Sequence, residues 1–178
     1  MNFSTHDQAK IQNMAHSIRE TGKGYIMSSA TMKTATAELL QRLYKNLKMG
    51  SDSIVSLLPK IKEEDAAFKG DLTLQLDGYE KYANQINDLL REDGESAEQD
   101  TLWNKMSAKV GTTMSTLMDA SVSHLADMVI QGSTMNMNET IKLMREFENT
   151  SASERSLSLS RDIVGFEEQN IERMKAYL

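Results

Sequence analysis

The chain has 178 residues, a formal net charge of −6 and no cysteine. The lack of cysteine excludes disulfides, thiolate catalysis and cysteine-ligated zinc or iron–sulfur clusters, and it fits a reducing compartment. No run approaches the roughly 18–20 consecutive apolar residues that a membrane helix needs, and the N-terminus lacks the basic-then-apolar layout of a signal peptide. We therefore expect a cytoplasmic protein with no membrane association.

The apolar residues of every long segment recur at steps of three and four, and no run alternates with a period of two. That spacing is typical of amphipathic helices, and a single proline in the whole chain interrupts it little. A chain of this length suits one hydrophobic core. The sequence predicts an all-α protein with one main domain at residues 34–178.

Residues 1–33 are predicted to form an N-terminal extension. A short amphipathic helix is expected there, ending at Gly22, on the basis of helically spaced Ile11, Met14, Ala15 and Ile18. Residues 21–31 contain two glycines and several small polar residues, a composition typical of a linker.

Two long antiparallel helices should follow. The first carries an uninterrupted stripe, with Gly50 at a position where a missing side chain permits close approach: Leu40, Leu43, Leu47, Gly50, Ile54, Leu57 and Ile61. Pro59 and the acidic residues 63–65 mark a turn and a new helix start. The second helix is expected to reach about Arg91, with an inward stripe of Phe68, Leu72, Gln75, Leu76, Tyr79, Ala83, Ile86 and Leu90.

Charge favours pairing of these two helices. Residues 33–62 carry six basic and two acidic side chains, whereas residues 63–100 carry three basic and twelve acidic ones. Each exposed ion pair is worth only about 0.2–1 kcal/mol, so the contribution is modest. The acidic block also argues against a nucleic-acid partner.

The most apolar long segment is Ser115–Gln131, which we expect to be a central helix covered by the others. Its predicted inward rows are Leu117, Ser121, His124 and Met128 on one side and Met118, Val122, Leu125 and Val129 on the other. Residues 115–148 form either one kinked helix or two consecutive helices, because Gly132 and Ser133 interrupt the pattern. The last helix is expected from Ser153 almost to Leu178, with Leu157, Ser160, Val164, Glu167, Ile171, Met174 and Leu178 inward.

Five polar residues are predicted to point into the core: Gln75, His124, Glu139, Glu167 and Asn170. An inward histidine or glutamine is readily satisfied by hydrogen bonds. A carboxylate on a long apolar stripe must instead pair, protonate or bind a cation, because desolvating it alone costs several kcal/mol. His124, Glu139 and Glu167 are therefore the candidate metal ligands.

Two antiparallel helix pairs, joined by a connection at residues 92–114 long enough to return along the bundle, resemble the ferritin-like four-helix architecture. The phrase FEEQNIERMKAYL near the C-terminus resembles the final helix of small ferritin-like bacterial proteins. Di-iron members carry a Glu and, three residues later, a His in that helix. Here the matching positions are Glu167 and Asn170, so the resemblance implies an up-down bundle with a crossover segment more than an activity.

We therefore expect a non-enzymatic helical bundle that associates with itself or with another protein, without a cofactor. The alternative is a ferritin-like oxidoreductase or metal-binding protein that holds iron, manganese or zinc at a non-standard site. The 13 methionines are either core filler or an adaptable surface for a partner. No phosphate-binding loop, HExxH or GxSxG motif is present.

Overall fold

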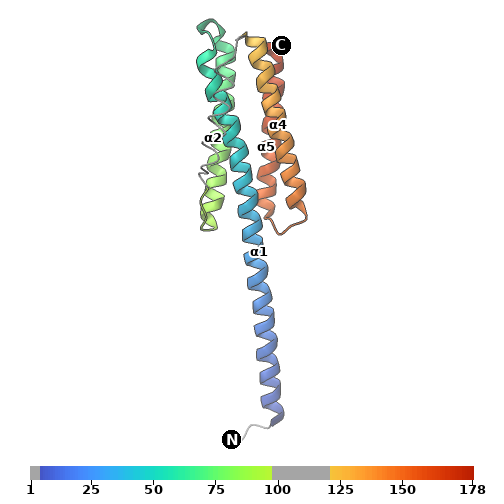
Figure 1. Ribbon diagram of the computed structural model, residues 1–178. Helices are drawn as coiled ribbons and strands as arrows, with labels where there is room; N and C mark the ends of the chain where they lie inside the picture. The colour runs from blue at the N-terminus through green and yellow to red at the C-terminus, as the bar shows by residue number, and fades with distance from the viewer. Residues whose placement is uncertain (1–4, 98–120) are drawn as a thin grey trace.

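The computed structural model describes the backbone of residues 5–97 and 121–178 and the side chains of residues 31–97 and 121–178 (Figure 1). Within these ranges there are four α-helices and no strand: α1 (Thr5–Leu57), α2 (Ala66–Glu92), α4 (Val122–Glu148) and α5 (Glu154–Met174). Short 3-10 turns lie at Leu58–Lys60, Glu63–Asp65 and Lys175–Tyr177. The all-α prediction is confirmed.

The four helices lie side by side, so that α1 packs on α2 and α4, and α5 packs on α4 and α2 (Figure 1). One end of the bundle is marked by an ion pair of 3.7 Å between Lys33 Nζ and Asp93 Oδ1. There too the Ser153 backbone N–H donates to Thr36 Oγ1 at 2.9 Å. At the other end the Tyr177 hydroxyl donates to Asp71 at 2.6 Å.

These contacts fix the helix directions. α1 and α2 are antiparallel, as are α4 and α5, while α2 and α4 run the same way (Figure 1). The C-terminus of α2 and the N-terminus of α4 therefore lie at opposite ends of the bundle. The chain between Asp93 and Ser121 has to connect those ends, a distance of about 40 Å for a 27-residue helix such as α4.

Local signals explain several helix ends. Ser121 and Ser153 precede α4 and α5, and each side-chain oxygen accepts a backbone N–H from the residue three positions later, His124 and Ser156. α2 ends before Gly94, whose φ of +81° is the left-handed conformation that favours glycine after a helix. The predicted loop at residues 91–100 thus begins at Asp93, and its last three residues lie outside the described ranges.

The predicted stripe of α1 is confirmed, since all of its apolar members are buried. The α2 stripe is buried at Phe68, Leu72, Gln75, Tyr79, Ile86 and Leu90, and the last helix is buried at Leu157, Ser160, Glu167 and Met174. Leu178 is exposed, contrary to expectation, because the chain ends in a 3-10 turn that rotates it out of the α5 register.

The N-terminal part of α1 differs from the prediction of a helix end at Gly22 and a linker at 21–31. α1 is one continuous helix of 53 residues that passes through both glycines. A glycine inside a helix costs only about 1 kcal/mol relative to alanine, which does not by itself terminate a long helix. This first part of α1 projects well beyond the ends of the other helices (Figure 1).

The expected central helix is also corrected. α4 starts at Val122, after an extended Ser121, and continues unbroken through Gly132 to Glu148; residues 115–120 lie outside the described ranges. It is one of four outer helices, not a surrounded centre, since Ser123, Asp127 and Gln131 face solvent. From residue 98 onward, the predicted connection at residues 92–114 also lies outside the described ranges.

Candidate functional site: a buried polar cluster

Glu167 lies in the middle of the bundle with no exposed surface. Among the residues whose side chains are described, it is the only buried Asp, Glu, Lys, Arg or His. Four polar side chains from two other helices join it: Gln75 and Tyr79 from α2, and Ser133 and Asn136 from α4. We call these five residues the Glu167 cluster.

The cluster is a chain of hydrogen bonds that crosses the core. The Tyr79 hydroxyl donates to Glu167 Oε2 at 3.1 Å, and Asn136 Nδ2 donates to Glu167 Oε1 at 2.8 Å. Gln75 Nε2 donates to the Tyr79 hydroxyl at 3.1 Å and to Ser133 Oγ at 2.9 Å. Every partner of the carboxylate is therefore an uncharged group.

Burial raises the pKa of Glu167 above its usual value, and the polar side chains of Asn136, Ser133, Tyr79 and Asn170 offset only part of that effect. Burial, followed by the nearby Glu167 carboxylate, also raises the pKa of the Tyr79 hydroxyl. The cluster thus makes Glu167 a weaker acid than usual and keeps Tyr79 neutral.

Several buried atoms of this region lack a hydrogen-bond partner within the described chain: Gln75 Oε1, Asn136 Oδ1, Thr140 Oγ1 and Asn170 Nδ2. Three of the four atoms are oxygens. A proton on Glu167 can serve such an acceptor, in particular Asn136 Oδ1, after rotation of the amide.

Two glycines make room for the aromatic rings beside the cluster. A Cβ atom at Gly50 of α1 would lie 2.5 Å from Cζ of Tyr79. Another at Gly78 of α2 would lie 2.2 Å from the Phe166 ring. Phe166 in turn packs edge-on against Tyr79, with ring centroids 5.2 Å apart. Tyr79 is therefore held by packing as well as by its hydroxyl.

The structure does not bring the three candidate metal ligands together. His124 is exposed, contrary to its predicted inward position, because α4 buries the row of Leu125 and Val129. Glu139 faces outward and pairs with Lys142 at 3.0 Å. His124 and Glu139 also lie 15 residues apart on one helix, about 22 Å along its axis, too far to share one ion.

Gln75 and Asn170 were also predicted to point inward, and both are buried as expected. Sequence reasoning missed four members of the inward row of α4: Ser133, Asn136, Thr140 and Leu143. The apolar residues Met137, Ile141 and Met144 lie one position further on and are only half-buried. The regular steps of three and four in the polar row were the available signal.

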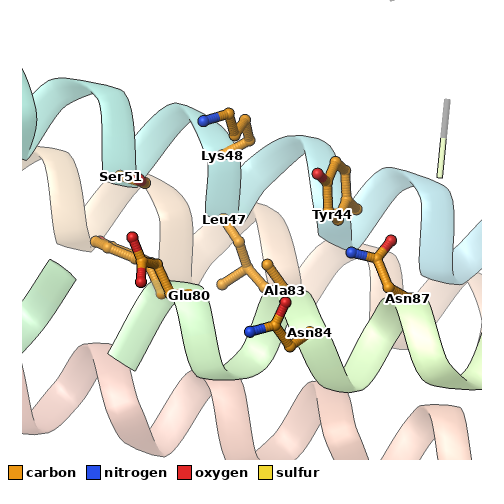
Figure 2. Close-up of a pocket in the computed structure, with 9 residues that line it drawn as sticks. Tyr44, Leu47, Lys48, Ser51, Glu80, Ala83, Asn84 and Asn87 are labelled. Atoms are coloured by element: carbon orange, nitrogen blue, oxygen red, sulfur yellow. The ribbon is translucent and has the colours of Figure 1, made fainter. Parts of the chain in front are cut away.

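A surface groove of about 240 Å³ lies beside the cluster, between α1 and α2 (Figure 2). Tyr44, Lys48 and Ser51 line it from α1, and Glu80, Asn84 and Asn87 from α2 (Figure 2). Tyr79 contributes to both the groove and the Glu167 cluster. The only cation in this lining, Lys48, already pairs with Asp52 at 3.1 Å.

Within the described ranges, no three His, Asp or Glu residues gather closely enough to hold a metal ion. The chemistry available to the Glu167 cluster is the uptake and release of one proton at a buried carboxylate.

Comparison with protein-family models, with curated proteins and with solved structures gave no match. None of the described helices has the length and apolar character required to cross a membrane. The class of protein is thus defined by its architecture alone, an all-α bundle of four long helices over the described ranges.

Proposed function

We propose that this is a non-enzymatic helical-bundle protein that acts through self-association or through binding of another protein, with the projecting part of α1 as its interaction surface. The observation that carries the proposal is the length of α1, whose first part extends beyond every other helix (Figure 1). Residues 5–32 would span about 42 Å at the rise of an α-helix.

The composition of this projecting part supports a need for a partner. Residues 21–31 include two glycines, two serines and two threonines, each of which costs roughly 0.5–1 kcal/mol relative to alanine in a helix. Most helical stability in proteins comes from packing of an apolar face and not from intrinsic propensity. A helix of this composition is expected to be stable when a partner covers its apolar face.

We also propose that the bundle has the ferritin-like architecture. Two antiparallel pairs with α2 parallel to α4, and a connection that joins opposite ends, support that assignment. A standard di-iron site of that architecture needs about four carboxylates and two histidines. Glu167 favours the alternative function of a metal-binding protein, but its neighbours are amides and hydroxyls, so this alternative has less support.

Amide hydrogen exchange of the full chain, measured over a range of protein concentrations beside sedimentation analysis, tests the proposal. We expect protection of residues 11–30 to increase with concentration as the sedimenting mass rises. Residues 39–54 of the same helix, which lie in the bundle, serve as the internal control and should be protected at every concentration. Rapid exchange of residues 11–30 in a monomer at all concentrations would contradict self-association.

A further inference from the structure

The sequence of the projecting part of α1 contains two interleaved repeats of seven residues. Large apolar residues stand at one heptad position: Ile11, Ile18, Tyr25 and Met32. Small residues stand at the other: Ala15, Gly22, Ser29 and Thr36. Because α1 is a continuous helix, both sets fall along one stripe of its surface.

The other helices of the bundle cover only the C-terminal end of this stripe. Thr36 is 5% exposed, and its hydroxyl accepts the Ser153 backbone N–H. Met32, one turn earlier on the same stripe, is 46% exposed. Thr36 is thus the member of the stripe that lies in the core. Met32 is not fully covered by any described part of the chain.

The alternation of large and small residues distinguishes between the two ways in which a second copy can pair. In a parallel helix pair, equivalent positions lie level, so layers of two large residues would alternate with layers of two small ones. The layers of small residues would leave gaps, which cost free energy in lost contacts. In an antiparallel pair, each large residue lies level with a small one, and all layers have similar volume.

We propose that two copies of the chain associate through residues 8–32 of α1 as an antiparallel helix pair. The inference rests on the proposed function and names its partner, a second copy. A two-fold axis relates the copies, so both contribute the same surface.

The proposed register pairs the whole of residues 8–32 and stops where the bundle begins. Ile11 lies level with Ser29 of the second copy, Ile18 with Gly22, and Tyr25 with Ala15. A slip by one heptad would instead place Ile11 level with Thr36, which is already buried against the α4–α5 loop. The paired length of 25 residues, about 37 Å, is three and a half heptads, which reaches the length expected of a coiled coil.

Cysteine cross-linking tests the orientation directly, because the chain has no cysteine of its own. Ala15→Cys and Tyr25→Cys variants, carrying different affinity tags, are oxidised separately and as a mixture. The antiparallel pair predicts disulfides between the two variants in about tenfold excess over disulfides within either one. A Val55→Cys variant, at an exposed position of the bundle, is the control and should not cross-link above background.

The remaining outcomes separate the two proposals. Cross-links of Ala15→Cys to itself would show parallel pairing, which overturns this inference and leaves self-association through α1 standing. Absence of cross-links from both variants, together with a monomeric sedimenting mass, would overturn both. Ile18→Asp should lower the association constant at least about tenfold. Leu74→Asp, an exposed leucine of α2, should leave it unchanged.

Discussion

Tyr79 lies against Gly50 so closely that a Cβ atom at Gly50 would stand 2.5 Å from Cζ of the ring. The same ring continues across the core to place its hydroxyl 3.1 Å from Glu167 Oε2. The missing side chain on α1 is therefore what allows α2 to reach α5 through the centre of the bundle.

Gly50→Ala should destabilise the protein by about 1–3 kcal/mol, the usual cost of adding a group to a packed site. Tyr79 cannot turn away without losing its hydrogen bonds to Gln75 and Glu167. The control is Gly132→Ala in the middle of α4, where an added Cβ meets nothing within 4 Å. That variant should gain about 0.5–1 kcal/mol. Urea denaturation measures both, and equal effects would contradict the tight contact.

Tyr79→Phe should cost about 1–3 kcal/mol, because it leaves the buried Glu167 oxygen and a Gln75 N–H without a partner. Tyr82→Phe is the matched control, since Tyr82 also packs on Phe166 but has no hydrogen bond in the described chain. Its stability should change by less than about 0.5 kcal/mol. Thermal and urea unfolding of the two variants should differ clearly; similar losses would show that the hydroxyl contributes little.

Glu167→Gln should make stability less dependent on pH. Because the pKa of Glu167 is raised in the folded protein, the folded state holds its proton at a pH where the unfolded chain has lost it. Its contribution to the free energy of unfolding is therefore most favourable below the unfolded pKa of about 4.3 and falls as pH rises through the folded pKa. Each unit of raised pKa is worth about 1.4 kcal/mol.

We accordingly expect the Gln variant to be nearly as stable as the wild type at pH 4.5 and more stable than the wild type at pH 8. The new amide can donate to Asn136 Oδ1, which lacks a partner. Glu168→Gln removes the same charge from an exposed neighbouring position and should not reproduce the effect. A parallel pH dependence of wild type and Glu167→Gln would refute the role of this carboxylate.

Added metal should not stabilise the protein through Glu167. Thermal melts of wild type and Glu167→Gln, each with and without iron(II), manganese(II) or zinc(II), measure this. A ligand that binds the folded state at 100 times its Kd would add about 2.7 kcal/mol, a shift that is easily seen. A large rise in the wild type that disappears in the variant would establish the metal-binding alternative.

The sequence predicted the α1 and α2 stripes well, because their inward residues are nearly all apolar and leave one possible face. It failed on α4, where the inward face carries Ser133, Asn136 and Thr140 and the apolar residues flank it. Apolarity alone therefore does not identify this part of the buried face. Only the partners on α2 and α5 explain why polar residues are buried there.

The same limit applied to the candidate site. Glu167 was predicted to be inward from its own helix, and that is confirmed. His124 was predicted to be inward because it shares a row with Leu117, Ser121 and Met128, but α4 buries the neighbouring row of Leu125 and Val129. Hydrogen bonds between helices, such as the one from Asn136 to Glu167, depend on how the two helices are aligned. The spacing of residues within one helix does not specify that alignment.

The short connections within each antiparallel pair divide the molecule into two hairpins, α1–α2 and α4–α5. Each can form from local contacts, whereas their docking must close the long connection between Asp93 and Ser121, a slower event. Glu167 sits on one hairpin, and Tyr79 and Gln75 approach it from the other. In a separate α4–α5 hairpin the carboxylate keeps contact with water, so the cost of dehydrating it falls on the docking step. The charge in the core therefore acts as a barrier to assembly, and its removal should speed folding more than it slows unfolding.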